Sequence, residues 1–495
     1  MSFGKKFIKV LKRGIALGMA LIGVLCFTGC SGADNPASNS KLITADPVLT
    51  IEDFKVGQST MNAILFLENG NLYGWGSNAN YTLGKDFPEL TVEKTPVLVL
   101  EDVADFACCG EILVVLKKDM TLWINGRYPR DGAESTYTKD FVKFDEGVVA
   151  VSDFHPSESI CFFLKKNGEL FCFGTMNAQP VETDYTPRLI DTGVSEMISA
   201  EKNLLFGTHL PTESCFKYIK NNTLCAVLKS SFAAAQSGEM KITKIFENVK
   251  KAGNSAMLYI NQDGNLYFKG KYMQGDTEKT ADEELLVAEK VKDYMVQTST
   301  GDLIYLMQNG QLYYAQGYLD GYDRWIRPLD AQRIDTAVKE IFTLYPQTLY
   351  YIKNNKTLWG MLQNNFLIGA GAISAYQSSN PYFKELNLDV VDYYNEPVKI
   401  LSDVEKFSIY GFVKVARSTD GEKFVWGVSV KMSRPVSVGY IPDPDNIDDQ
   451  CRAQMIFFDD YEAFLEYKAA WDSDIVDFED SFIVPTPWDE AFESQ

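Results

Sequence analysis

Residues able to do catalytic or metal chemistry are scarce in this chain. Its 495 residues include two histidines, His155 and His209, which lie in short stretches typical of loops. Two imidazoles are too few for most zinc sites, and their positions disfavour a Ser-His-Asp arrangement. No phosphate-binding glycine loop, dinucleotide fingerprint or HExxH motif occurs. We therefore expect no catalytic residue, no metal site and no cofactor.

Carboxylates are the remaining groups that could catalyse a reaction, because two suitably placed Asp or Glu side chains can hydrolyse a glycosidic bond. The chain holds 67 acidic residues, and the sequence does not show that any two of them converge in space. The acidic run from Asp443 to Asp449 lacks the glycine and the terminal glutamate of an EF-hand loop. A solvated acidic loop is the better interpretation of that run.

Aromatic side chains in the long connections between strands are the candidates for ligand binding. Tyr and Trp are frequent in contact patches for proteins and sugars, since they combine a large apolar area with a polar group. The alternative, that each ring packs over an edge of the fold, stays open for every one of them. The candidates are Tyr318, Tyr322, Trp325, Tyr376, Tyr382, Tyr393 and Tyr394.

The first 29 residues have the profile of a secretory signal peptide. Five basic residues between Lys5 and Arg13 precede an apolar stretch from Gly14 to Phe27, and no acidic residue occurs before Asp34. A transmembrane helix needs about 20 mainly apolar residues, and this stretch is shorter and rich in glycine. The chain that follows is therefore expected outside the cytoplasm.

The sequence FTGC, which ends at Cys30, resembles the lipobox of bacterial lipoproteins, with phenylalanine where leucine is usual. The resemblance implies cleavage before Cys30 and lipidation of its thiol by palmitate-like acyl chains, which would hold the protein at the extracytoplasmic face of the cell membrane. Residues 30–46, rich in Ser, Asn, Ala and Asp, then form a flexible tether. A signal peptide cut nearby, or an uncleaved anchor, are the alternatives.

The charge of the chain excludes one class of partner. The formal net charge is −20, and loss of the basic signal peptide would make the mature chain more acidic. Such a surface repels phosphate backbones, so we expect no nucleic acid partner. Residues 441–495 are especially acidic and include an apolar pattern at helical spacing from Phe457 to Ala469. They predict an acidic, partly helical C-terminal extension.

Seven cysteines would remain after processing and lipidation, an odd number that rules out complete disulfide pairing within one chain. If the turn at Asn167-Gly168 has two residues, Phe163 lies opposite Cys172 and Cys161 lies only diagonal to it. Most of these cysteines are therefore interpreted as small core residues.

Eight segments of one design recur along the chain. Each has an apolar strand, a polar turn and a second strand in which a leucine and an aromatic residue usually follow the turn. Turn pairs such as Asn69-Gly70 and Asn167-Gly168 predict two-residue hairpin turns, which need positive φ. Both strand faces are apolar and must be covered, as they are between the blades of a propeller. The segments begin at Ala63, Ile112, Ile160, Cys215, Ala256, Asp302, Thr348 and Phe412.

The repeats resemble those of the regulator of chromosome condensation family. The resemblance is carried by LYGWG from Leu72 and GEKFVWG from Gly421, and it covers roughly residues 47–440. It implies an all-β fold, a single β-propeller of seven, possibly eight, four-stranded blades. The family's role in nucleotide exchange on a small GTPase is not expected, because export separates the chain from cytosolic GTPases.

These observations predict four parts: a signal peptide (1–29), a tether (30–46), a β-propeller (47–440) and the acidic extension (441–495). The predicted function is a membrane-anchored scaffold that binds a protein or a glycan. The alternatives are a hydrolase of cell-envelope polymers or glycans with carboxylates at the mouth of the propeller, and a secreted type of protein inhibitor. That last alternative rests on fold analogy alone.

Overall fold

The structure is a computed structural model of the chain, and its described residues belong to one compact unit, Thr44–Gln495. They extend from 47 to 427 and from 482 to 492. Within the first range, the structure does not describe 59–62, 79–80, 85–91, 110–111, 128–136, 154–158, 176–184, 199–213, 229–239, 254–256, 298–299, 321–322, 345–347, 362–369, 371, 374–388, 391–395 and 412.

The described residues form eight antiparallel sheets of four strands, and each sheet is one blade. The first four blades follow one another along the chain. Blade 1 is β1 (Phe54–Gln58), β2 (Ala63–Glu68), β3 (Asn71–Ser77) and β4 (Val92–Leu100); blade 2 is β5 (Val103–Cys109), β6 (Ile112–Lys117), β7 (Thr121–Arg127) and β8 (Tyr137–Glu146). Blade 3 is β9 (Val148–Asp153), β10 (Ser159–Lys165), β11 (Leu170–Thr175) and β12 (Arg188–Asp191); blade 4 is β13 (Val194–Ile198), β14 (Ser214–Lys220), β15 (Thr223–Leu228) and β16 (Ile242–Phe246).

Blade 5 has a long hairpin between its last two strands, and blades 6, 7 and 8 contain insertions before their outer strands. Blade 5 is β17 (Val249–Ala252), β18 (Leu258–Asn261), β19 (Leu266–Gln274) and β20 (Thr277–Ala288); blade 6 is β21 (Val291–Gln297), β22 (Asp302–Met307), β23 (Leu312–Ala315) and β26 (Gln332–Asp335). Blade 7 is β27 (Val338–Leu344), β28 (Thr348–Lys353), β29 (Leu358–Met361) and β32 (Val398–Leu401); blade 8 is β33 (Val404–Tyr410), β34 (Val413–Ser418), β35 (Lys423–Gly427) and β36 (Phe482–Pro487). The insertions hold β24 (Tyr318–Asp320) with β25 (Asp323–Trp325), and β30 (Ala372–Ile373) with β31 (Asp389–Val390).

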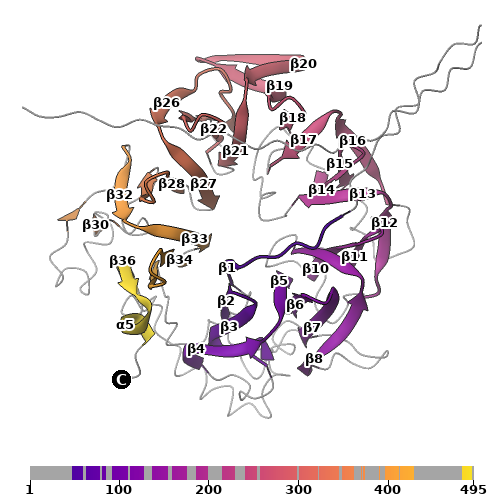
Figure 1. Cartoon of the computed structure of the whole chain (residues 1–495). Coiled ribbons are helices and arrows are strands. Elements are labelled where there is room, and N and C mark those ends of the chain that lie inside the picture. The colour runs from indigo at the N-terminus through magenta and orange to yellow at the C-terminus, as the bar shows by residue number, and fades with distance from the viewer. Residues whose placement is uncertain are drawn as a thin grey trace, which may run out of the picture. The chain divides into compact units, whose positions relative to one another are not determined.

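The blades stand in a ring, with the first strand of each blade innermost and the last outermost (Figure 1). Inner strands of neighbouring blades contact one another, as β5 does β9 and β27 does β33. The ring closes between β1 and β33. This architecture confirms the predicted all-β propeller and decides its blade count as eight.

One apolar cluster fills each junction between consecutive blades in the described part of the chain. At the closing junction, Val56 and Phe66 of blade 1 pack with Val415 and Val425 of blade 8. Successive residues of a strand pack into the clusters on opposite sides of their blade. Leu303 packs toward blade 5, whereas Ile304 packs toward blade 7. Two-sided burial explains why the repeats read as continuous apolar runs.

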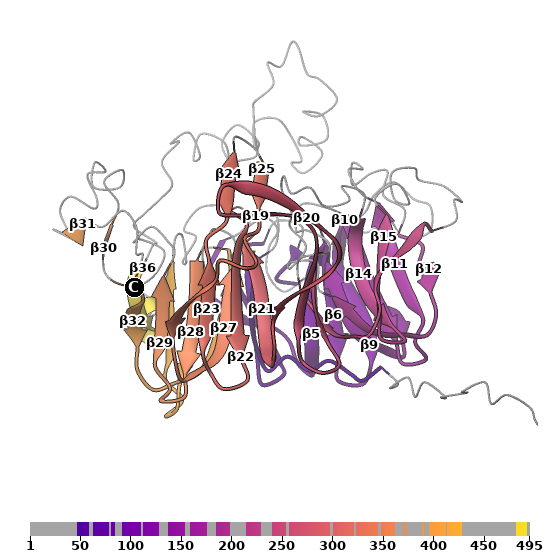
Figure 2. The ribbon, with the colours of Figure 1, turned by 90° about the horizontal axis from the view of Figure 1, so that it is seen from above.

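Backbone hydrogen bonds fix the order of the blades. The valine that begins an inner strand donates its N–H to the hairpin turn of the preceding blade, as Val103 does to Gly70, Val194 to Gly168 and Val338 to Gly310. These bonds place the hairpin turns and the inner-strand starts on one face of the ring, which we call the turn face. The opposite face, from which the insertions emerge, is the loop face (Figure 2).

The prediction of two-residue turns is right for some hairpins and wrong for others. Asn69 and Gly70 form such a turn, and both have positive φ. At Asn167-Gly168 the turn has three residues, because Leu164 pairs with Leu170 and Lys165 accepts the N–H of Gly168. The Asn167 side chain accepts the N–H of Glu169, which stabilises the longer form.

The longer turn shifts the pairing of the cysteine-containing strands. Cys172 lies opposite Phe162, not Phe163, and Cys161 lies opposite Phe173. The interpretation of cysteines as core residues is confirmed where the structure describes them. Cys108, Cys109, Cys161, Cys172 and Cys225 are free and buried.

The fourth strand of blade 8 comes from the stretch predicted as an acidic extension. β36 pairs with β35, with Thr486 opposite Val425, and the short helix α5 (Trp488–Phe492) follows it. α5 packs on blade 1: the rings of Trp488 and Phe492 lie 5.6 and 5.2 Å from that of Trp75. The eighth hairpin is therefore part of a complete blade. The helix expected from Phe457 lies outside the described residues.

An extended segment, Pro47–Asp53, leads into β1 across the turn face, and we call it the strap. The N–H groups of Thr50 and Glu52 donate to the carbonyls of Val149 and Ala104, each over 2.7 Å. Leu49 packs into the clusters on both sides of blade 3. The strap thus bridges the inner strands of blades 2 and 3. Among the described residues, no helix is long and apolar enough to span a bilayer.

Candidate binding surface

A raised structure stands on the loop face where blades 5 and 6 meet (Figure 2). It comprises residues 269–284 of the β19–β20 hairpin and residues 317–330 around β24 and β25, and we call it the crest. The two parts are joined by hydrogen bonds from the N–H of Met273 to Ile326 O (3.1 Å) and from the N–H of Gly275 to Asp330 Oδ2 (3.2 Å). It holds two of the aromatic residues predicted to bind a ligand.

A buried carboxylate fixes the base of the crest. Asp302 Oδ1 accepts the N–H of Gly317, immediately before β24, over 2.6 Å. Burial raises the pKa of Asp302, and the hydrogen bond from Gly317 opposes this change. Gly317 lies so close to the backbone of Thr300 that a Cβ atom there would stand 2.0 Å from the Thr300 carbonyl oxygen. The backbone at the base is therefore packed without room for a side chain.

Tyr318 is half-buried, and a cation covers its ring. The guanidinium of Arg327 lies 5.1 Å from the ring centroid. Arg327 also pairs with Asp276 at the tip of the β19–β20 hairpin, over 3.4 Å. Because Asp276 is highly exposed, this ion pair is weak on its own, and it orients Arg327 more than it stabilises the fold.

Trp325 is 8% exposed, so most of its ring lies inside the crest. Lys271 lies 6.0 Å from the ring centroid and pairs with Glu278 over 3.0 Å. The arrangement repeats that of Tyr318: an aromatic residue of β24–β25 is covered by a cation, which an acidic residue of the β19–β20 hairpin holds in place. One face of each ring is therefore occupied by a cation, and Trp325 is in addition too deeply buried to stack on a sugar.

Sequence reasoning missed the charged half of the crest. Lys271, Asp276, Glu278 and Arg327 show no unusual spacing, because the contacts of Lys271 with Trp325 and of Arg327 with Asp276 join different blades. The unusual length of the hairpin from Leu266 to Ala288 was the available signal.

The other predicted site residues lie outside the described residues. This holds for the lipidation candidate Cys30, for both histidines, and for the acidic run from Asp443 to Asp449. Five of the seven aromatic candidates, Tyr322, Tyr376, Tyr382, Tyr393 and Tyr394, lie there too. Their assignment as ligand-binding residues stays a prediction, as it does for Tyr318 and Trp325.

Three blade junctions carry the same ion pair near the turn face. The last residue of a second strand is a lysine that pairs with an aspartate at the end of the preceding blade. These pairs are Lys165–Asp145 (2.7 Å), Lys220–Asp191 (2.6 Å) and Lys353–Asp335 (2.7 Å). Although burial favours the neutral acid, hydrogen bonds from Lys220 and Tyr218 keep the pKa of Asp191 below its ordinary value.

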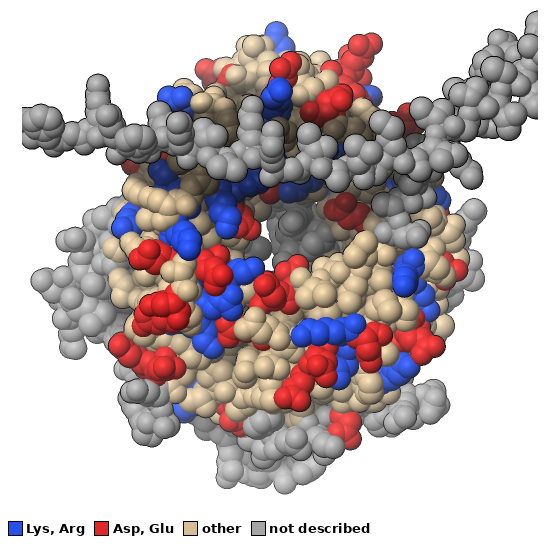
Figure 3. Space-filling view, in the orientation of Figure 1, with Lys and Arg blue, Asp and Glu red and all other residues tan. Residues whose placement is uncertain are grey.

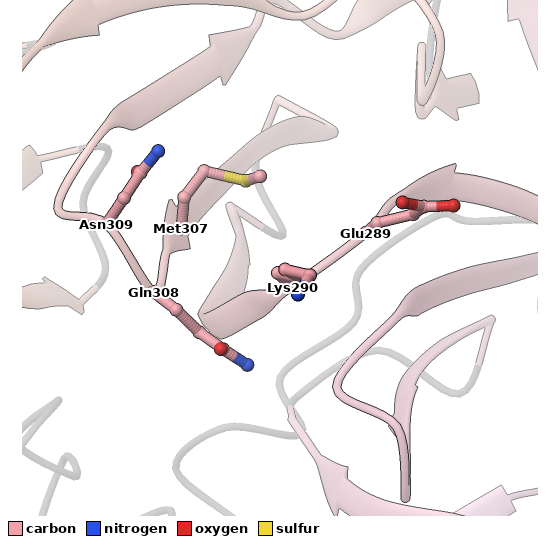
Figure 4. A pocket seen from close by; sticks show the side chains of 5 residues that line it. All are labelled: Glu289, Lys290, Met307, Gln308 and Asn309. Atoms are coloured by element: carbon pink, nitrogen blue, oxygen red, sulfur yellow. The ribbon is translucent and has the colours of Figure 1, made fainter.

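The junction of blades 5 and 6 lacks this pair, because Ala288 and Met307 occupy the two positions. A groove of about 490 Å³ lies there on the turn face. Glu289 and Lys290 form one wall, and Met307, Gln308 and Asn309 form the other (Figure 4). Of the described residues that line it, Glu289 alone carries a carboxylate. Among the described residues, no group of three or more His, Cys, Asp or Glu side chains is placed to hold a metal ion.

Comparison with known proteins finds a likeness in three-dimensional structure but none in sequence. No family model matches the chain, and no curated protein matches it in sequence. Among solved structures, Prp20p from Saccharomyces cerevisiae, described with its binding to Gsp1p and histones, is 11% identical with a TM-score of 0.41, over 78% of this chain and 84% of that chain.

Yeast RCC1 (Prp20) bound to Kap60 is 12% identical with a TM-score of 0.42, over 91% of this chain and 100% of that chain. Human WBSCR16 is 11% identical with a TM-score of 0.40, over 75% and 96%. The eight blades, and not these distant likenesses, establish the architecture. This chain is an eight-bladed β-propeller, the fold that its repeats implied.

Proposed function

We propose that this protein is a bacterial lipoprotein, anchored through Cys30 at the extracytoplasmic face of the cell membrane, whose propeller binds a partner protein through its loop face. The single observation that carries the proposal is the opposite placement of the strap and the crest. The strap lies on the turn face, and the crest rises from the loop face (Figure 2). A tether that enters on the turn face leaves the loop face free for a partner.

The chemistry of the crest favours a protein over a glycan. Its two described aromatic candidates are covered by Arg327 and Lys271. The side chains that it exposes are mainly charged or polar, including Thr277, Lys279 and Asp282. Charged surfaces of this kind choose a partner by electrostatic complementarity. A rigid ring also suits this role, since little conformational entropy is lost when it binds.

Intact-mass spectrometry of the membrane-extracted protein tests the anchor. We expect the wild type to begin at Cys30 with added acyl mass, because several acyl chains retain a protein stably where one binds reversibly. The variant Cys30→Ser should lose both the cleavage and the acyl mass. An unmodified Cys30 in a released, soluble protein would contradict the anchor.

Site-specific cross-linking on intact cells tests the binding face. A photo-reactive amino acid at Thr277, exposed on the crest, should give a discrete protein adduct. The same group at Asn354, exposed in the blade 7 turn on the turn face, should not. Equal adducts from both positions, or an adduct from Asn354 alone, would refute the assignment of the loop face.

A further inference from the structure

Two aliphatic side chains of the strap project into solvent. Val48 is 81% exposed and Ile51 is 58% exposed, more than any other large apolar side chain among the described residues. Single exposed apolar residues are ordinary on protein surfaces. These two are only three positions apart, on the segment through which the chain enters the propeller.

The strap holds both side chains in place. The backbone between them is fixed by the bond from Thr50 to Val149, and the next bond, from Glu52 to Ala104, follows directly after Ile51. Leu49, between Val48 and Thr50, is inserted against the blade clusters. Val48 and Ile51 are therefore carried by a backbone that is anchored to two blades.

We infer that the turn face rests on the lipid bilayer and that Val48 and Ile51 enter the boundary between the headgroups and the acyl chains. This inference rests on the proposed anchor at Cys30. Residues 31–46, between that cysteine and the strap, extend at most about 55 Å when fully stretched. Such a short link keeps the strap at high effective concentration near the membrane, where the insertion of small apolar groups is favourable.

The charges around the strap specify the kind of bilayer. Glu52 is exposed, Asp53 is paired with Lys406 over 3.1 Å, and Lys55 is paired with the buried Asp105 over 2.9 Å. Basic and acidic side chains are interspersed over the rest of the turn face (Figure 3). The strap itself carries two acidic residues and no Lys or Arg, so the favoured surface is zwitterionic, and anionic headgroups would repel the strap.

Lipid-borne quenching of a fluorophore tests the contact in the full-length, lipidated protein. Val48→Cys and Thr277→Cys are each labelled with nitrobenzoxadiazole and reconstituted in phosphatidylcholine vesicles that contain a doxyl-labelled lipid. Quenching should be several-fold stronger at position 48 than at position 277 on the crest. Equal quenching at the two positions would overturn the inference.

A matched pair of substitutions separates lipid contact from simple proximity. With the fluorophore on Ile51→Cys, the added substitution Val48→Asp should weaken the quenching several-fold. Val484→Asp changes a 48%-exposed valine of β36 and should leave it unchanged. If both substitutions leave the quenching intact, the strap does not enter the bilayer.

Two further readouts complete the test. Replacing phosphatidylcholine with phosphatidylglycerol should weaken the quenching at position 51, and stronger quenching there would contradict the zwitterionic preference. The mass of the same preparation tells the two proposals apart. An acylated protein without quenching refutes the contact alone, whereas a protein without acyl mass refutes the anchor.

Discussion

Lys217 and Lys414 have their amines inside the propeller, and burial lowers the pKa of each from the ordinary 10.5 to about 7. The Lys217 ammonium donates to the carbonyl of Gly253 in the next blade, over 3.1 Å. Between about pH 7 and 10.5, the unfolded chain binds protons at these amines that the folded chain does not bind. The free energy of unfolding must therefore rise with pH in that window.

Lys217→Met tests this proton linkage. The slope of the unfolding free energy against pH should fall by up to about 1.4 kcal/mol per pH unit between about pH 7.5 and 9.5. The reason is that the variant takes up one proton fewer when it unfolds. Denaturant unfolding at several pH values measures the slope. Lys269→Met, at an exposed position, should leave it unchanged. An unaltered slope in Lys217→Met would mean that its amine keeps an ordinary pKa.

At the scale of the elements, the conformation of a hairpin turn is set by residues within the turn, whereas that of the crest is set by residues from two blades. Asn167 stabilises its own turn by accepting a hydrogen bond from the N–H of Glu169, two residues further along the chain. The crest depends on Asp302 and Gly317, fifteen positions apart, and on the blade 5 hairpin. Its shape therefore depends on how neighbouring blades pack.

Gly317→Ala should loosen the crest. The new Cβ atom would meet the Thr300 carbonyl oxygen at 2.0 Å, so the backbone must shift and the bond to Asp302 weakens. We expect a loss of about 1 to 3 kcal/mol and faster amide hydrogen exchange across β24 and β25.

Gly275→Ala is the matched control for that substitution. Gly275 has a φ of +57° and nothing within 4 Å of an added Cβ, so only backbone strain of about 1 kcal/mol is expected. If the two variants exchange alike in β24 and β25, close packing at Gly317 does not hold the crest.

At the scale of the whole molecule, the ring depends on residues from both ends of the described chain. Blade 8 is completed by β36, and α5 carries the C-terminal segment onto blade 1. Arg417 and Lys423 of blade 8 both pair with Glu68 of blade 1, over 3.1 and 3.0 Å. The junction that closes the ring, between blades 8 and 1, is therefore held by an apolar cluster and by the Glu68 carboxylate, which pairs with two cations.

Phe492→Ala tests the contribution of α5 to closure. Phe492 is 8% exposed and packs on Trp75, so its truncation should lower the free energy of unfolding by about 3 kcal/mol. Val484→Ala, at an exposed position in β36, should change it by less than about 0.5 kcal/mol. Equal small effects in denaturant unfolding would show that the ring closes without α5.

The sequence by itself determined the repeat, the β-propeller and the expected place of the cysteines, because strand alternation, turn residues and apolar faces are local patterns. The tertiary structure decided the blade count, since β36 joins β35 across more than fifty residues. It also decided that cations cover Tyr318 and Trp325, and that the strap crosses the turn face. Those features depend on how separate segments pack against one another in space, which the strand and turn patterns within one repeat do not specify.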